Sequence, residues 1–275
     1  PALSSAGIGS TNRAQLEVLH RRTSGPFGIE EAAKLLERPP DETARLLGYL
    51  ARRGWLTRVR RGLYLTVPLD ARRSGEWVED PWIVATRVFA PCYIAGWSAG
   101  EYWDLTEQLF RTTLVVSGTK VRQSEQELQG LRFEVTTRAP AMLFGTRPVW
   151  RGQTRVEVSD PSRTIVDVMD EPRLGGGIRQ CSAVVHEYLR SEHRDDELLV
   201  DYGDRVGNRT VFKRLGYLLE SQEERHGVAS LVEQCKARIS TGYAALDPSN
   251  RAKGRIVRRW GLRVNVAITA GDISD

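Results

Sequence analysis

Cysteine is rare in this chain of 275 residues, and long hydrophobic runs are missing. The three cysteines (Cys92, Cys181 and Cys235) are far apart and form no C-x-x-C pair, so the sequence supports neither a structural zinc site nor a disulfide framework. No apolar run approaches the roughly 20 residues that a spanning helix needs. The first residues, PALSSAGIGSTNR, lack the basic and apolar regions of a signal peptide. We therefore expect a cytoplasmic protein that has no contact with membranes.

Several signatures of catalysis are missing as well. The sequence contains no G-x-x-x-x-G-K-[ST] phosphate loop, no H-E-x-x-H pair and no D-x-D pair for two-metal nucleotidyl transfer. No lysine has an acidic residue two places before it, which excludes the D/E-x-K corner of many nucleases. We therefore expect no enzymatic activity, no cofactor and no metal.

One catalytic pattern is present. Gly96-Trp97-Ser98-Ala99-Gly100 matches G-x-S-x-G, the nucleophile elbow of α/β-hydrolases, and follows the strand-like residues 93–95. The β/α units that should precede such an elbow are missing, and so is an HGGG-type oxyanion segment. We therefore predict that Ser98 lies near the start of a helix beside a packed Trp97. The alternative hypothesis, that the chain is an enzyme fused to a regulatory module, is supported only by Ser98.

Two weaker patterns have structural explanations. His186 and His193 are seven residues apart, a spacing compatible with one helix face, and a solvated or capping role is favoured over a metal site. Gly175-Gly176-Gly177 precedes an expected helix, where an anion can bind. The spacing of a dinucleotide-binding loop is missing, so a flexible connection is the preferred interpretation.

Arginine is abundant. The chain has 40 basic and 35 acidic residues and a formal charge of +5. Only five of the basic residues are lysines. The planar fork of arginine suits guanine and phosphate, but an arginine-rich composition also follows from a GC-rich genome. The positions of the arginines are therefore more informative than their number.

Residues 27–68 combine these arginines with a recognisable order of elements. After a first helix that Thr11 or Asn12 caps and that runs to about Arg22, the pattern predicts a second helix at 30–37, which Pro39-Pro40 ends. Asp41 is expected to cap a third helix that buries Ala44, Leu47, Leu50 and Ala51. Strands at 55–59 and 63–67 then form a hairpin around Arg60-Arg61-Gly62. This order is typical of a winged helix-turn-helix, whose commonest use is to insert one helix into the major groove of DNA.

The third helix and the hairpin supply the predicted DNA contacts. A winged helix used only for protein contacts is the alternative, but the charge gathers on the two elements that this fold uses. We expect Thr43, Arg45 and Tyr49 to reach base edges and the groove. The residues expected to contact the DNA backbone are Arg52, Arg53, Arg58, Arg60 and Arg61.

Beyond a polar stretch at 69–79, strands come first and helices later, which favours an α+β fold. We predict a flexible tail at 1–11, a winged helix at 12–70, a linker at 71–79 and a larger mixed α+β domain at 80–275. The elements expected in the last domain are helices at 81–89, 98–103, 162–169, 178–190, 196–202, 210–220 and 228–235, and strands at 112–117, 131–137, 142–147, 155–158 and 262–268.

Several segments in this order resemble the AbiEi family, the antitoxin and regulator half of type IV abortive-infection toxin–antitoxin pairs. They are RRGLY at the hairpin, CYIAGWSAGEYWDLTEQLFRTTLVVSG, VEVSDPSRTIVDVMD before the glycines, FKRLGYLLE, and ALDPSNRAKGRIVRRWGLRVNVA. The resemblance covers nearly the whole chain.

The resemblance implies a winged helix that binds inverted repeats in double-stranded operator DNA and represses its own operon. It also implies a C-terminal domain that neutralises a nucleotidyltransferase-like toxin without a stable complex. The alternative is a stand-alone regulator whose C-terminal domain senses a ligand or mediates assembly. A second basic cluster is equally compatible with nucleic-acid binding and with a solvated loop: Arg251, Lys253, Arg255, Arg258 and Arg259.

Overall fold

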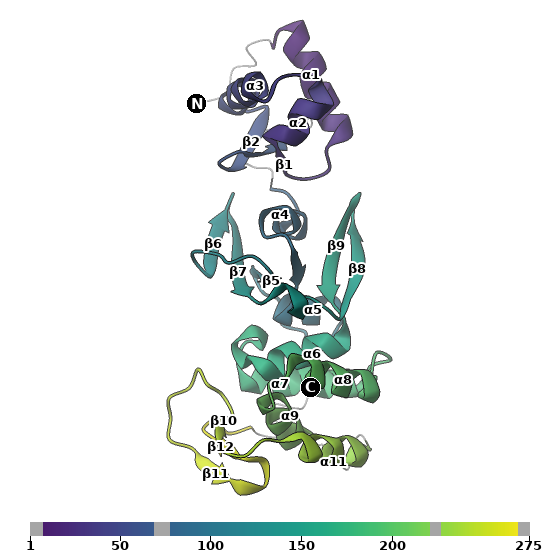
Figure 1. Cartoon of the computed structure of the whole chain (residues 1–275), viewed down its shortest axis with the longest axis vertical. Coiled ribbons are helices and arrows are strands. Elements are labelled where there is room, and N and C mark those ends of the chain that lie inside the picture. Colours follow the sequence, from purple (N-terminus) through teal and green to yellow (C-terminus); the bar gives the residue numbers. More distant parts are fainter. Residues whose placement is uncertain (1–7, 69–77, 221–226, 269–275) are drawn as a thin grey trace.

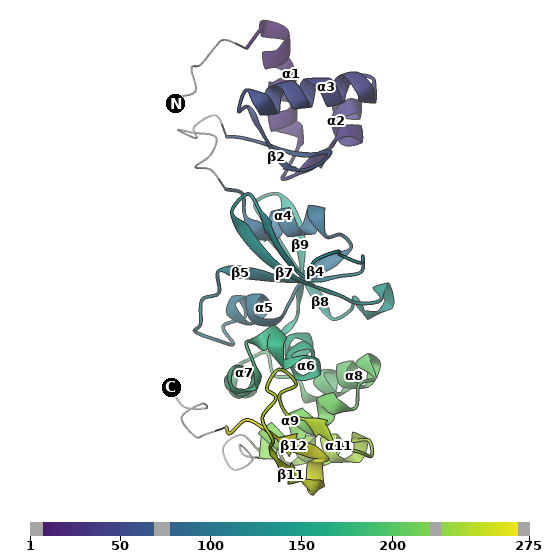
Figure 2. The same cartoon turned by 90° about the vertical axis from the view of Figure 1, so that its left-hand side faces the viewer.

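The computed structural model describes residues 8–68, 78–220 and 227–268. Three packed parts lie one above another along the long axis (Figures 1 and 2). A helical part with a small sheet contains the N-terminus, a six-stranded sheet follows, and a group of helices with a third sheet ends the chain. The fold is mixed α+β, as the sequence predicts. The expected tail residues 1–7 and linker residues 71–77 lie outside the described residues.

The N-terminal part has the predicted winged helix-turn-helix order. Three helices surround a three-stranded antiparallel sheet with strand order β1-β3-β2. Its elements are α1 (Ser10–Arg22), β1 (Phe27–Gly28), α2 (Ile29–Leu36), α3 (Pro40–Arg52), β2 (Leu56–Arg60) and β3 (Leu63–Thr66).

Two predicted helix caps are wrong by two or three residues. Helix α3 begins at Pro40, a favourable first position for proline, so the cap residue is Pro39 and the expected cap, Asp41, lies in the first turn. Helix α1 begins at Ser10, and its cap residue is Gly9 rather than the expected Thr11 or Asn12. Both helices therefore begin earlier than the predicted caps imply.

The middle part is a mixed sheet with strand order β6-β7-β5-β4-β9-β8. Strands β4 and β9 pair in parallel, as do β5 and β7, whereas the other neighbours are antiparallel. The elements are α4 (Pro81–Val88), β4 (Cys92–Ile94), α5 (Gly96–Tyr102), β5 (Thr112–Ser117), β6 (Glu125–Leu128), β7 (Leu131–Thr137), η1 (Pro140–Met142), β8 (Thr146–Arg151) and β9 (Thr154–Ser159).

The two faces of this sheet have separate apolar cores. On one face, α4 packs on Ile94, Val115 and Val158, and the same cluster includes Val59 and Leu65 of the winged helix. On the other face, Trp97 of α5 packs with Tyr93 and residues of β5. The sheet is therefore covered above and below, as Figure 1 shows.

The C-terminal part is mostly helical and holds the largest apolar cluster. Asp160 caps its first helix by accepting a hydrogen bond from the N–H of Arg163 at 2.8 Å. The elements are α6 (Pro161–Asp170), η2 (Pro172–Gly175), α7 (Ile178–Arg190), α8 (Asp196–Val206), α9 (Thr210–Glu220), α11 (Ala229–Arg238), β10 (Ala244–Ala245), β11 (Arg255–Val257), η3 (Arg258–Trp260) and β12 (Leu262–Val264).

Two features of residues 140–193 differ from what the sequence suggested. The strand expected at 142–147 begins only at Thr146, because residues 140–142 form a 3-10 turn and Gly145 adopts a positive φ of 69°. Helix α7 ends at Arg190, as predicted, so His193 lies beyond it and shares no helix face with His186, which is buried rather than solvated. Within the described ranges, no helix is long and apolar enough to span a bilayer.

Candidate nucleic-acid interface

Helix α3 is held by one apolar stripe. Leu46, Leu47 and Leu50 are buried and pack against Leu19 and Phe27 in the core of the winged helix. These positions repeat at helical spacing, so the opposite side of the helix faces solvent.

The buried stripe includes Thr43, which corrects the sequence prediction. Thr43 precedes Leu46 by three residues and Leu47 by four, so it lies on the same helix face. Its side chain is 0% exposed, and among the described residues its hydroxyl has no hydrogen-bond partner. Thr43 cannot contact a base edge in this fold, and the expected core positions Ala44 and Ala51 are only partly buried.

The solvent side of α3 carries cations and one aromatic ring. Arg45, Arg52 and Arg53 are exposed, and Tyr49 is partly buried. The guanidinium carbon of Arg53 lies 5.7 Å from the centre of the Tyr49 ring. Arg52 and Arg53 lie at the C-terminal end of the helix, where positive charge complements the helix dipole.

A shallow open pocket lies beside these side chains. Its rim includes an ion pair in which Nη2 of Arg38 is 2.9 Å from Oε2 of Glu42, so one of the two acidic residues in the first turn of α3 is neutralised. Sequence reasoning missed Arg38 because it lies in the turn before α3. The pocket is lined by Asn12, Arg38, Glu42, Arg45, Leu46 and Tyr49.

The wing is the hairpin of β2 and β3. Its register shifts between Arg58 and Arg60, and Gly62 closes the turn with a φ of 77°. The two sides of the hairpin are both covered, since Tyr64 packs in the winged-helix core and Leu65 belongs to the cluster around α4. Only the edge and the tip of the wing remain exposed.

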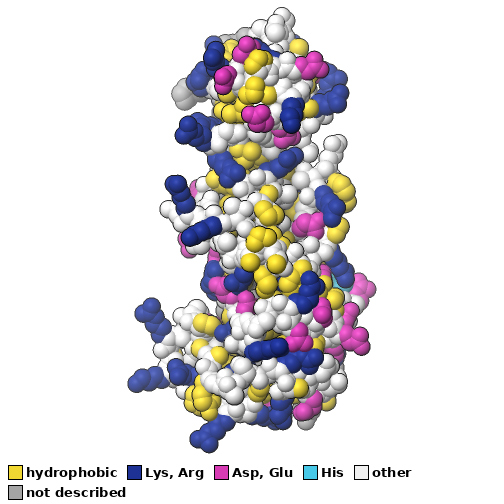
Figure 3. Space-filling model, viewed as in Figure 1, with side chains coloured by type: hydrophobic (Ala, Val, Ile, Leu, Met, Phe, Trp, Pro, Cys, Tyr) yellow, Lys and Arg dark blue, Asp and Glu magenta, His cyan; other side chains and the backbone are white. Residues whose placement is uncertain are grey.

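Six exposed arginines lie on α3 and the wing. Among the described residues, no carboxylate lies within ion-pair distance of these six, whereas many other arginines are paired. Figure 3 shows dark blue side chains at the upper left, over α3 and β2. Six of the eight predicted residues are therefore exposed cations without an acidic partner in the described part of the chain: Arg45, Arg52, Arg53, Arg58, Arg60 and Arg61.

The second basic cluster lies at the other end of the molecule, around the sheet β10-β12-β11 (Figure 3, lower left). One of its members is not available, because Arg259 forms an ion pair with Glu220. The tryptophan beside it, Trp260, is fully buried and donates to Oε2 of Glu220 at 2.7 Å. The remaining members are exposed: Arg251, Lys253, Arg255 and Arg258.

Ser98 is part of the scaffold of the sheet. It is the third residue of α5 and is buried, and its Oγ accepts a hydrogen bond from the N–H of Leu114 at 2.9 Å. Trp97 is also buried and donates to the carbonyl of Thr112 at 2.7 Å. The predicted position at a helix start beside a packed tryptophan is confirmed.

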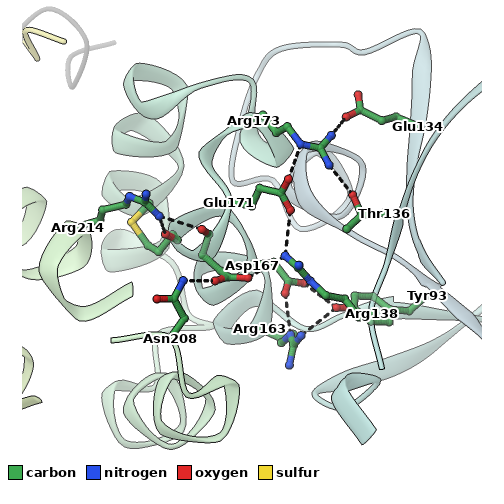
Figure 4. A network of polar contacts seen from close by, with 12 residues as sticks. Tyr93, Glu134, Thr136, Arg138, Arg163, Asp167, Glu171, Arg173, Asn208 and Arg214 are labelled. Atoms are coloured by element: carbon green, nitrogen blue, oxygen red, sulfur yellow. Dashed lines mark hydrogen bonds and ion pairs between the residues drawn. The ribbon is translucent and has the colours of Figure 1, made fainter. Parts of the chain in front are cut away.

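The densest polar cluster of the described residues joins the sheet to the helices (Figure 4). Asp167 accepts hydrogen bonds from Tyr93 at 3.0 Å and from Nε of Arg163 at 2.9 Å. Burial raises the pKa of Asp167 even though Arg163 opposes this. Arg138 bridges Asp170 and Glu171 at 2.8 and 3.0 Å. Because these groups bind one another between packed elements, the cluster is a structural joint.

The glycine-rich turn before α7 has a partner from a distant part of the chain. Asp247 accepts a hydrogen bond from the N–H of Ile178, the first residue of α7, at 3.0 Å. Its other carboxylate oxygen accepts from the N–H and hydroxyl of Ser249. Burial alone would raise the pKa of Asp247, but these hydrogen bonds lower it below its ordinary value. The position where an anion was considered therefore holds the chain's own carboxylate.

Within the described ranges, no group of three or more His, Cys, Asp or Glu side chains is arranged to hold a metal ion. His186 and His193, whose seven-residue spacing is compatible with one helix face, do not share one, because His193 lies beyond the end of α7. The surface of α3 and the wing is thus the best-defined candidate site in the structure.

Three helices, a short first strand and an arginine-tipped hairpin define the N-terminal part as a winged helix-turn-helix of the kind found in transcriptional regulators. Residues 15–67 match the family model of the AbiEi antitoxin transcriptional regulators. The resemblance drawn from the sequence is confirmed over these residues.

The chain is also similar in fold to a protein of known structure. The crystal structure of the RV2827C protein from Mycobacterium tuberculosis matches with a TM-score of 0.64 over 95% of this chain and 94% of the other. The sequence identity is 16%, so the likeness concerns the fold. No curated protein matches the chain.

Proposed function

We propose that this chain is a DNA-binding antitoxin that represses its own toxin–antitoxin operon through the winged helix. The observation that carries this proposal is the set of six exposed, unpaired arginines on α3 and the wing of a part that matches regulator antitoxins. Unpaired arginines release counterions when they bind phosphates, and they also reach guanine in the major groove. The partner is double-stranded operator DNA with inverted repeats, in the cytoplasm.

We further propose that residues 80–275 neutralise a nucleotidyltransferase-like toxin without forming a stable complex with it. The division of the two roles between the two parts of the chain follows the predicted limits of 12–70 for the winged helix and 71–79 for the linker. The four exposed cations of the second basic cluster can contact a nucleic acid in addition to the winged helix. No catalytic role is assigned to any residue of the chain.

The test of DNA binding is footprinting and gel-shift titration on the DNA directly upstream of the protein's own reading frame. Replacing Arg60 and Arg61 by alanine should weaken binding and reduce the slope of log K against log salt by about two, because each lost phosphate contact removes roughly one counterion. A matched control replaces the exposed Arg111 and Arg122, which changes the net charge equally away from the wing. Unchanged affinity at every salt concentration would refute the DNA role of the wing.

The test of the antitoxin role is co-expression with the product of a nucleotidyltransferase-like reading frame next to this gene. Restored growth in the presence of the full chain supports the proposal, and the full chain with Arg60 and Arg61 replaced by alanine should bind DNA more weakly but still restore growth. If the full chain represses transcription and never restores growth, the alternative of a stand-alone regulator is correct.

A further inference from the structure

A glycine lies in the middle of the exposed side of α3. Gly48 is three residues after Arg45 and four before Arg52, so all three lie on one line along the helix. Glycine inside a helix costs roughly 0.5–1 kcal/mol relative to alanine, because the unfolded backbone is freer. A glycine at this position of an otherwise regular helix therefore calls for a structural or functional explanation.

Packing within the chain does not explain Gly48. A Cβ atom built on Gly48 would meet only Nη1 of Arg52, at 3.7 Å, which is an ordinary van der Waals contact. Two other helical glycines differ: a Cβ on Gly203 would lie 2.6 Å from the ring of Phe212, and one on Gly216 would collide with Trp260. Those two glycines are required by the fold, whereas Gly48 has room for a side chain.

We propose that Gly48 is the point where the backbone of α3 comes closest to the base edges in the major groove of DNA. The partner is DNA, because Gly48 lies between Arg45 and Arg52, two exposed arginines that have no acidic partner among the described residues. Arg45 and Arg52 then reach into the groove on either side of Gly48, and the absence of a side chain at Gly48 allows the helix backbone to approach the bases. This inference rests on the proposed DNA-binding function.

The test compares Gly48→Ala and Gly48→Leu with the wild-type protein, using the upstream DNA and a mixed-sequence duplex. Alanine should raise the melting temperature by about 2 °C, because it stabilises the helix. It should nevertheless weaken binding to the upstream DNA about tenfold, and leucine should weaken it more. Binding to the mixed-sequence duplex should change little, since phosphate contacts carry it. Ala14→Leu, on the exposed side of α1, is the control for added volume.

Each outcome has a clear meaning. A more stable Gly48→Ala variant with reduced preference for the upstream DNA supports the inference. If the wild-type protein prefers the upstream DNA and Gly48→Ala keeps that preference, the inference is wrong and the proposed function stands. If the wild-type protein binds neither duplex, both are wrong.

Discussion

Thr43 and Arg45 are two residues apart on α3 and lie on opposite sides of it. Two residues of an α-helix turn through about 200°, so burial of Thr43 directs Arg45 to solvent. The polar character of threonine suggested an outer position. Its spacing from the two leucines that follow it decides its place in the core.

Replacing Thr43 by valine tests this correction. The hydroxyl is buried without a partner among the described residues, so its removal should raise the free energy of unfolding by about 1 kcal/mol. DNA affinity in the gel-shift titration should stay within twofold of wild type. Arg45→Ala is the matched variant on the outer side and should weaken binding without changing stability. A loss of DNA affinity in Thr43→Val would contradict the buried position.

The wing is an element that two cores hold at once. Its strands contribute Leu56 and Tyr64 to the winged-helix core and Val59 and Leu65 to the cluster around α4. An ion pair between Arg87 and Glu31, at 3.6 Å, adds a contact between α4 and α2. The arginine tip is therefore fixed relative to the sheet below it.

Leu65→Ala should lower the free energy of unfolding by about 3 kcal/mol, because it removes a side chain that is 1% exposed and leaves a cavity. Chemical denaturation of the full chain measures this loss. The control is Leu109→Ala, where the side chain is 84% exposed and the change should be below about 0.5 kcal/mol. Equal stability of the two variants would show that the hairpin is not packed on α4.

At the scale of the whole molecule, Asp247 ties the C-terminal segment to the start of α7, 69 residues earlier in the chain. Asn265 strengthens this contact between Asp247 and α7, since it donates a hydrogen bond to the carbonyl of Asp247 at 2.7 Å. The segment that carries the second basic cluster is thereby anchored to the helices. A single carboxylate connects regions that no local pattern relates.

The stability of the contact between Asp247 and the start of α7 should depend on pH. Because folding lowers the pKa of Asp247, its contribution is complete above the ordinary value of 3.8 and is lost as the pH falls below it. Protection factors for hydrogen exchange, which allow for the slower intrinsic exchange in acid, should therefore fall in acid for residues 244–264. In Asp247→Asn, protection should already be lower at neutral pH and respond less to acid. Asp201→Asn, at an exposed aspartate, is the control and should behave as wild type. Identical acid responses in all three proteins would exclude this role.

Local sequence signals predicted many of the elements well. The strands at 112–117 and 131–137 and the helices at 178–190 and 210–220 agree with the structure at both ends. Their apolar periods are regular and their ends carry clear stop signals. Strand β6 was missed because Glu125 and Glu127 make its pattern polar, and it is an edge strand with one neighbour.

Local sequence patterns are enough to predict the winged-helix order, the six exposed arginines of α3 and the wing, and the family resemblance, because these depend on neighbours within a few turns. Long-range packing, in contrast, pairs Arg259 with Glu220 and brings Asp247 to the start of α7. Each of these depends on which distant groups meet when apolar faces pack. Local spacing defines the faces of an element, and packing decides what each face contacts.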